Sequence, residues 1–434
     1  MMISLSLIAI AMGLLLSPGP LTILGNNMGM AGASFLVIIL TGLVVHLFTA
    51  LSFGELSLHF PGPDGEARLL KESIGHTPAL VLPLCSRVLF TLCVATSILA
   101  TAGYAFNEIF ILWFPNLGFS FCLLGFLLLI NFLGPRVSNT AQIFFAVFTF
   151  LGLLLLSIVG LLHLGKAPLN FEASNPDPFR ISRVILFGLV LFVGFDLAIF
   201  AKGNDRHHPM KLIRSMIFGL LLAAIILALW GLVSLKYVTP SKLADTTVPH
   251  MLAARQIMGQ SGRVIMGLVV MAGSCAAVNA LLMAVSRMIS AMTNQNLLPS
   301  VFCLGPKRLS IPLILLGLGI AAMMATGMAG KPQIETYIKA AIWFWLLHYA
   351  TMHVSILIMR WRSPGRFPPF QLFVSPVMPI VGALTLLMGL TGLLWTASEG
   401  AILMKSILVV LVTVSIFAFF LIRLTQRREK SLSS

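Results

Sequence analysis

The chain has 434 residues, of which 58% are hydrophobic and only 9% carry a charge. Soluble globular domains carry a charge on about 25% of their residues, so this composition excludes a soluble globular protein. A formal net charge of +15 could suggest a nucleic-acid partner, but the basic residues are distributed in a way that indicates a membrane protein instead.

Long apolar stretches follow one another along the whole chain. A helix needs about 18 or more mostly apolar residues to cross a bilayer, and by that criterion the sequence predicts twelve spans. In chain order they cover residues 3–27, 33–58, 80–113, 118–134, 138–164, 183–201, 211–237, 263–294, 310–329, 333–360, 375–396 and 401–423. We therefore expect an all-α integral membrane protein with twelve transmembrane helices.

Most of the 28 Lys and Arg residues fall in loops and span ends on the side of the N-terminus. Cytoplasmic loops carry such an excess of positive charge, which places both termini in the cytoplasm and removes the reason to expect nucleic acid. We expect a multi-pass protein of the inner cell membrane, surrounded by lipid, with a basic cytoplasmic tail at 424–434.

Two of the predicted spans are interrupted near their middle. The first contains Ser17-Pro18-Gly19-Pro20, and the sixth contains Phe192-Val193-Gly194-Phe195-Asp196. Proline removes a backbone donor, and in hydrocarbon an unwound turn is tolerated only where protein or a water-lined cavity satisfies its polar groups. Two such interruptions at matching places predict a transporter binding site between them.

The interruptions also predict what binds there. A half-helix that starts after Pro20 directs N–H groups and a positive dipole end into the cavity, which favours a carboxylate. An unwound turn at Val193-Gly194 exposes carbonyl oxygens, which favour an ammonium group. Phe192 and Phe195 flank this turn and either cover the substrate or pack as ordinary helix residues.

The spans divide into five, five and two. Residues 1–164 form a first repeat of five spans and residues 180–362 a second repeat, which enters the membrane in the opposite sense because the number per repeat is odd. Two further helices occupy 375–423. Between the repeats lies a long outer loop at 165–182, and short helices are expected at 248–258 and 66–74.

Few ionisable residues lie inside the predicted spans, and such residues are functional candidates by default. Asp196 follows the second interruption, where it couples protonation to gating or simply caps freed N–H groups. Glu55 lies near the inner end of the second span, within reach of inner cations such as Arg287.

The sequence shows no motif typical of an enzyme active site. His348 and His353 are five residues apart, a spacing that does not stack two metal ligands on one helix face. Neither a nucleophile–base pair nor a phosphate-binding loop is evident, so we predict no catalytic residue, no metal and no cofactor. A channel would need rings of polar groups along a pore, and the spans do not show them.

Several patches spread over nearly the whole chain resemble the amino acid–polyamine–organocation (APC) transporter superfamily. Leu51-Ser52-Phe53-Gly54-Glu55-Leu56-Ser57, with Phe60-Pro61 and Gly65-Glu66 after it, is similar to the family's pattern behind the second span. Gly194-Phe195-Asp196 with Pro209 and Lys211 resembles its sixth-span pattern. The most specific match is Ser286-Arg287-Met288-Ile289-Ser290-Ala291-Met292 with Leu298-Pro299.

The resemblance implies a LeuT-like fold of two inverted five-helix repeats plus two helices. It further implies an amino acid or amine substrate, moved by exchange or proton symport while spans 1, 2, 6 and 7 rock against the others. By the same resemblance, the backbone from Ser17 to Leu21 would hold the substrate carboxylate, and the backbone from Phe192 to Gly194 would meet its amino group. Asp196 matches the family's acidic residue in the sixth span.

The chain departs from the family pattern in two places. Ser17-Pro18-Gly19-Pro20 replaces the usual Gly-(Ser/Thr)-Gly, and Pro18 cannot donate a hydrogen bond. Where many members have a lysine in the fifth span, this chain has Thr149. Ser274 is a candidate ligand for sodium. A sodium site needs several oxygen ligands, however, and a single hydroxyl is too few, so we expect proton coupling rather than sodium coupling. Ser17 to Leu21 also resembles the start of the shorter LysE-type exporters, a match that we interpret as coincidence.

The sequence as a whole predicts a secondary transporter for neutral amino acids, because no acid inside a span other than Asp196 is placed to pair with a cationic side chain. An amine or polyamine transporter, an amino acid exporter and a non-transporting membrane subunit remain as alternatives. We expect a monomer or homodimer.

Overall fold

The computed structural model describes residues 4–110, 113–162, 186–201, 209–302, 310–363, 365, 377–396 and 400–433. Within these residues the chain is helical, with no strand. The long outer loop expected at 165–182 and the basic loop before Pro209 fall outside the described residues. Apolar sequence explains the helices, because every backbone polar group must find a partner within its own segment when lipid surrounds it.

Among the described residues, seven helical stretches are long and apolar enough to cross a membrane. They are α3 (Phe35–His59), the continuous run of α5 (His76–Pro83), η2 (Leu84–Val88) and α6 (Leu89–Ile109), then α8 (Pro135–Leu161), α10 (Pro209–Tyr237), α13 (Gln260–Thr293), α15 (Pro332–Arg362) and α17 (Gly400–Ser433). An eighth is a bent pair, α1 (Leu5–Gly13) with α2 (Pro18–Ala31).

Shorter apolar helices lie at the four other predicted positions. These are α7 (Asn116–Phe132), the segment Leu186–Phe200, α14 (Ile311–Ala325) and α16 (Met378–Thr396). The all-helical membrane architecture is thereby confirmed. The count of twelve spans, the inverted repeat and the division at 1–164, 180–362 and 375–423 stay predictions.

Short helices connect the long ones. Helices α4 (Gly65–Ile74) and α12 (Pro249–Met258) occur where the sequence predicts them. The others are α11 (Pro240–Asp245) and the 3₁₀ turns η1 (Gly32–Ser34), η3 (Phe195–Phe200), η4 (Ser300–Phe302) and η5 (Met328–Gly330).

Large apolar side chains cover the outside of the helix bundle. Phe144 on α8, Leu318 on α14 and Phe420 on α17 are each about three-fifths exposed. Exposed apolar surface on this scale is a liability in water, whereas in a bilayer it faces lipid. The protein is therefore a multi-pass membrane protein.

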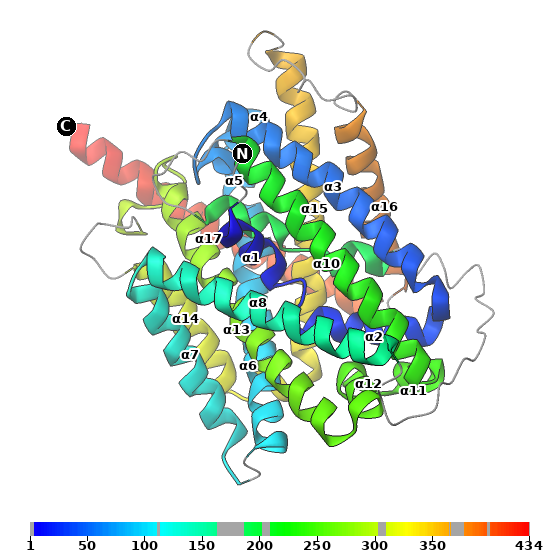
Figure 1. Ribbon diagram of the computed structural model, residues 1–434. Helices are drawn as coiled ribbons and strands as arrows, with labels where there is room; N and C mark the ends of the chain where they lie inside the picture. The colour runs from blue at the N-terminus through cyan, green and yellow to red at the C-terminus, as the bar shows by residue number, and fades with distance from the viewer. Residues whose placement is uncertain are drawn as a thin grey trace.

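Helix α1 lies in the middle of the bundle (Figure 1), packed against α8, α10, α13 and η3. A buried chain of amides holds it there. The Gln142 side chain donates to the Ala9 carbonyl at 3.0 Å, Asn279 donates to Gln142 at 2.8 Å, and Asn131 donates to Asn279 at 2.8 Å. This chain ties the start of the first span to α7, α8 and α13, and so positions the interruption that follows.

Small residues bring the second of the two interrupted spans close to α3. A Cβ added to Gly42 on α3 would lie 2.2 Å from the Gly188 carbonyl oxygen, and one added to Gly188 would lie 2.2 Å from the Ile38 carbonyl oxygen. Helices in membranes approach closely through such residues, because van der Waals contact replaces the hydrophobic effect there. The segment that leads into the second interruption is thus held against α3.

His250 on α12 gives the fold a pH dependence. The residue is 2% exposed, neither ring nitrogen has a partner, and burial lowers its pKa from 6.5 to about 4. Between pH 4 and pH 6.5 the imidazole binds a proton in the unfolded chain but not in the folded protein, so a falling pH favours unfolding. The contribution of neutral His250 to stability is therefore complete above pH 6.5 and is lost as the pH falls toward 4. We expect the free energy of unfolding to fall by up to about 3 kcal/mol as the pH drops from 6.5 to 4.

Thermal unfolding in detergent across this pH range measures the effect. The His250→Leu variant removes the titrating group, so its unfolding temperature should fall less than that of the wild-type protein. Parallel curves for the two proteins would contradict the assignment.

Candidate functional site

The first interruption lies between α1 and α2. Helix α1 ends at Gly13, α2 begins at Pro18, and the two axes are bent by 54°. The sequence predicts a half-helix that begins after Pro20, at Leu21; the structure starts it three residues earlier, at Pro18. The reason is that proline at the first helical position sets φ for the helix and lacks only an N–H that would be unpaired in any case.

The second interruption is a turn at residues 192–194, between a helical segment at 186–191 and the 3₁₀ helix η3. Gly194 has φ +105°, a conformation that side chains with a Cβ rarely adopt. Its N–H donates to the Tyr349 hydroxyl oxygen at 3.2 Å, and its carbonyl accepts from Leu197 N–H at 3.2 Å. The N–H that the unwound turn frees at Gly194 is thus satisfied by α15, as an interruption in hydrocarbon requires.

The two interruptions meet. A Cβ added to Gly194 would lie 2.3 Å from Leu14 Cδ2, which means that the Leu14 side chain rests on the bare glycine backbone. The prediction that both breaks contribute to one place in the molecule agrees with this contact.

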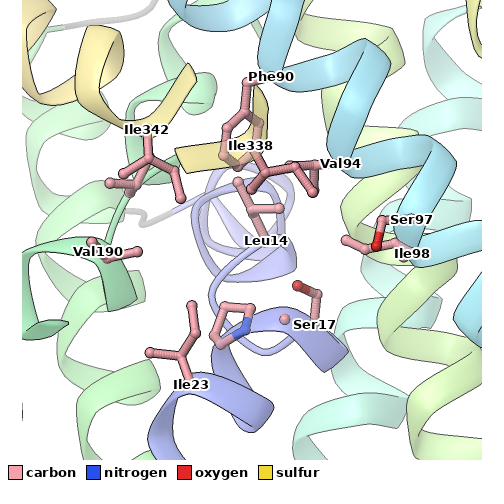
Figure 2. Close-up of a pocket in the computed structure, with 13 residues that line it drawn as sticks. Leu14, Ser17, Ile23, Phe90, Val94, Ser97, Ile98, Val190, Ile338 and Ile342 are labelled. Carbon is pink, nitrogen blue, oxygen red and sulfur yellow. The ribbon is translucent and has the colours of Figure 1, made fainter. Parts of the chain in front are cut away.

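A cavity of about 110 Å³ opens beside this contact (Figure 2). Its walls come from the first interruption, the second interruption, α6 and α15, with side chains that point toward a common centre. The lining residues are Leu14, Ser17, Gly19, Pro20, Ile23, Phe90, Val94, Ser97, Ile98, Val190, Val193, Ile338 and Ile342. None of the described residues that line this cavity has an ionisable side chain.

Polar groups in the cavity concentrate at the start of α2. Ser17 Oγ is buried and has no hydrogen-bond partner. Next to it, Gly19 leaves open space, since a Cβ added there meets nothing within 4 Å. Pro18 and Pro20 have no N–H and Leu21 N–H is bonded to the Ser17 carbonyl at 3.3 Å, so Gly19 supplies the N–H at this helix end. A carboxylate is the group that such an end favours.

The predicted site residues divide into two sets. Ser17, Gly19, Pro20 and Val193 line the cavity, whereas the described lining does not include Pro18, Leu21 or Gly194.

The two phenylalanines beside the second interruption face away from the cavity. The Phe192 and Phe195 rings both pack on His46 of α3, with ring centroids 5.9 Å and 5.7 Å from the imidazole. Phe195 also contacts Phe53 and Tyr349. In this structure they are packing residues of the α3–α15 contact.

Thr149 and Ser274 lie near the first interruption, beside Gly273, whose added Cβ would contact Leu16 O and Thr149 Cγ2. Both hydroxyls bond within their own helices, however. Thr149 Oγ1 donates to the Phe145 carbonyl at 2.8 Å and Ser274 Oγ to the Val270 carbonyl at 2.7 Å. Each hydroxyl therefore already makes one hydrogen bond, which restricts how its oxygen can coordinate an ion.

A buried charge cluster lies below the cavity, on the side of α4. Its centre is Arg87 in η2, a single π-helical turn that follows Pro83; such turns are frequent at functional sites. Arg87 Nη2 lies 2.5 Å and Nε 3.1 Å from Asp196 Oδ2. The other carboxylate oxygen, Oδ1, accepts from the Tyr349 hydroxyl at 2.5 Å and from Trp345 Nε1 at 3.2 Å.

Glu66 of α4 completes the cluster from the opposite side. Its Oε2 accepts from Arg87 Nη2 at 2.9 Å, and its Oε1 accepts from Arg87 Nη1 and from His348 Nε2, the latter at 2.9 Å. Burial by itself raises the pKa of Glu66, but the charges and hydrogen bonds of Arg87 and His348 outweigh burial and lower the pKa to about 2. These contacts favour the ionised form of Glu66.

Two aromatic rings connect the charge cluster to the wall of the cavity. Phe90, which lines the cavity, meets Trp345 edge-on with ring centroids 4.8 Å apart, and Trp345 in turn donates to Asp196. Trp345, His348 and Tyr349 are three and four residues apart, so they share one face of α15. A displacement of Phe90 would thus act on Asp196 through Trp345.

Sequence reasoning placed Asp196 at a functional position but missed its partners. Arg87 counted as one of many basic residues on the inner side, and Glu66 appeared only in a family pattern. A signal was present: Arg87 is the one charged residue in the apolar run from Ala79 to Gly103, and a charge inside a span needs a buried partner.

Glu55 and Arg287 do not pair with each other, as the sequence suggests they could. Glu55 pairs with Arg360, at 2.6 Å and 2.9 Å, rather than with Arg287. Arg287 instead donates to the carbonyls of Phe200 and Ala201, where η3 ends. A cation at a helix C-terminus is favourable, so Arg287 secures the segment that carries Asp196.

Comparison with protein families decides what this bundle is. A family model described as amino acid permease matches residues 4–422, nearly the whole chain. The chain belongs to the amino acid permease family. A search of curated proteins returned no match. The permease is accordingly a membrane transporter of amino acids, and the APC resemblance seen in its sequence patches is confirmed.

Proposed function

We propose that the permease moves neutral amino acids with apolar side chains across the cytoplasmic membrane by alternating access, either as an antiporter or as a proton-coupled symporter. The observation that carries this proposal is the cavity at the two interruptions, which is apolar apart from the polar groups near Ser17 and the hydroxyl of Ser97. We also propose twelve spans in two inverted five-helix repeats plus two helices, with both termini in the cytoplasm.

The substrate carboxylate would lie at the start of α2, where Ser17 Oγ has no hydrogen-bond partner. Gly19 N–H belongs to the first turn of α2, whose N–H groups have no acceptor within the helix. The ammonium group of the substrate would meet backbone carbonyls of the turn at 192–194. The side chain would then contact Val94 and Ile342. An amine without a carboxylate would leave the buried donors unpaired, at a cost of about 1–3 kcal/mol, which favours amino acids over polyamines.

The lining also argues against charged side chains. A cationic or anionic side chain in this cavity would lose its hydration without meeting an ion partner, and burial of an unpaired charge is strongly unfavourable. Arginine, glutamate and putrescine should therefore be poor substrates, whereas alanine, valine, leucine and methionine should be good ones.

Tracer exchange in proteoliposomes tests the proposal. Vesicles are loaded with one unlabelled compound from this set, and uptake of labelled leucine is followed with and without imposed proton and sodium gradients. Stimulation by internal apolar amino acids only is the expected result. Strong stimulation by arginine or putrescine would contradict the substrate class, and no stimulation by any compound in folded protein would favour a non-transporting membrane subunit.

The Gly19→Val variant should block exchange without unfolding the protein. A Cβ at Gly19 meets nothing within 4 Å, so the fold accepts it, yet the side chain fills space in the cavity. Overlap with a bound substrate costs about 1–3 kcal/mol, which corresponds to a loss of roughly tenfold or more in affinity.

Gly125→Val on α7 is the matched control, because a Cβ there also meets nothing within 4 Å but lies away from the cavity. Equal leucine exchange by the two variants would show that the substrate binds elsewhere.

A further inference from the structure

The charge cluster below the cavity is not electrically balanced by its permanent charges. One guanidinium, Arg87, faces two carboxylates, Glu66 and Asp196, and all three side chains are at most 3% exposed. An uncompensated negative charge in such a place is strongly unfavourable, because burial removes its hydration. A bound proton removes it.

The hydrogen-bond geometry shows where that proton does not lie. Both oxygens of Asp196 face donors: the guanidinium of Arg87, the Trp345 N–H and the Tyr349 hydroxyl, which already accepts from Gly194. Both oxygens of Glu66 likewise face Arg87 or His348. A protonated carboxyl needs an acceptor for its O–H. Asp196 faces donors on both oxygens and is ionised, whereas Glu66 could give a proton only to Nε2 of His348, so the extra proton belongs to the Glu66–His348 pair.

Nδ1 of His348 is the atom of the cluster that can take up a proton. The other ring nitrogen, Nε2, lies 2.9 Å from Glu66 Oε1 and donates to it while Glu66 is ionised, because a carboxylate only accepts. Nδ1 is buried and has no hydrogen-bond partner. A proton on Nδ1 turns the ring into a cation and brings the four side chains to zero net charge.

We propose that Arg87, Glu66, Asp196 and His348 form a proton-binding site, in which Nδ1 of His348 holds the coupling proton as long as Asp196 stays docked on Arg87. The inference rests on the proposed function, and it assigns to that transporter a coupling ion and the residue that carries it.

Charge balance links the proton to the conformational change. Asp196 belongs to the second interrupted span, whereas Arg87 lies between α5 and α6, on a different span. If these spans separate, Asp196 leaves, and Arg87, Glu66 and a charged His348 would carry one excess positive charge. The proton on His348 is then released, and the remaining three groups are neutral. Closure restores Asp196 and binds a proton again.

The other groups around the cluster do not change this balance. Helix α13 contributes the uncharged sulfur of Met288, 3.7 Å from Arg87 Nη1, while Arg287 points to the end of η3. Arg87 Nη1 also lies 3.4 Å from His348 Nε2. Both atoms donate to Glu66, and their mutual repulsion helps to expel the proton once Asp196 has left.

Proton movement and substrate movement measured in the same proteoliposomes test the proposal. A pH-sensitive dye inside the vesicles reports protons, labelled leucine reports substrate, and valinomycin with potassium clamps the membrane potential. The wild-type permease should bring in about one proton with each leucine, because the site binds one proton.

His348→Gln should lose this proton influx, since an amide does not bind a proton. Glu66→Gln should lose it for a different reason: the cluster is then neutral without a proton. The second variant carries the test if size-exclusion chromatography shows that the first does not fold.

His353→Gln is the matched control. This residue is buried on the same helix, but it bonds Ser52 Oγ at 2.9 Å and Thr49 Oγ1 at 3.2 Å, away from the cluster. It should keep the wild-type ratio of protons to leucine.

Three outcomes would overturn the inference. Net leucine uptake by the wild-type protein without proton influx would remove the coupling ion and leave the proposed function standing. A wild-type ratio in His348→Gln would show that the proton lies on another residue. Failure of the wild-type permease to exchange any amino acid would remove the proposed function itself, and the inference with it.

Discussion

Replacement of Arg87 by methionine should destabilise the permease more than any other single substitution in the bundle. Methionine has a similar length but no charge, so Asp196 would remain buried and ionised without an ion partner, and Glu66 would keep only His348. Removal of one partner from a buried ion pair costs about 3–5 kcal/mol. We expect a markedly lower unfolding temperature in detergent and no amino acid exchange.

Arg263→Met is the matched control for this prediction. Arg263 is about one-quarter exposed and lies 3.9 Å from Glu108, itself mostly exposed; such pairs contribute at most about 1 kcal/mol. The triple variant Arg87→Met, Glu66→Gln, Asp196→Asn removes all three charges and should unfold at a higher temperature than Arg87→Met alone. An Arg87→Met protein as stable as Arg263→Met would show that the cluster is not ionised as described.

Gly194→Ala should abolish exchange with a smaller loss of stability. A Cβ at φ +105° is strained, at a cost of about 1–3 kcal/mol, and it would also press on Leu14 at the first interruption. The backbone can relieve this strain only by turning, which would break the bond from Gly194 N–H to Tyr349 and move Asp196. Leucine exchange and thermal unfolding measured together separate the two effects.

The double variant Gly194→Ala with Leu14→Ala distinguishes the causes. It removes the contact with Leu14 but not the strain of the positive φ, so exchange should remain absent. Recovery of exchange would show that contact with Leu14, and not the backbone conformation, limits this position. Gly118→Ala on α7, where an added Cβ makes ordinary contact at 3.6 Å, should behave as wild type.

The two interruptions were predictable because proline and glycine act on their own backbone. Pro18 and Pro20 set the start of a half-helix wherever it packs, and a glycine-containing turn within an apolar span signals an unwound segment in any neighbourhood. The apolar length of each helix is likewise a local property, so the helical membrane architecture follows from composition and spacing.

The roles of side chains around the site were much less predictable. Phe192 and Phe195 sit beside the interruption in sequence, yet they pack on His46, because their direction depends on which helix lies next to them. Thr149 and Ser274 are near the first interruption, but their hydroxyls bond to carbonyls one turn back in their own helices. Neither outcome has a signature in residue order.

The sequence by itself determined that this protein is an all-helical membrane transporter with two interrupted spans, since hydrophobic length, proline position and charge asymmetry act locally along the chain. Only the tertiary structure decided which charges meet. Glu66 and Arg87 are 21 residues apart, Arg87 and Asp196 109, and Arg87 and His348 261. Ion pairing in low dielectric depends on distances of a few ångströms between atoms, and helix packing alone sets those distances.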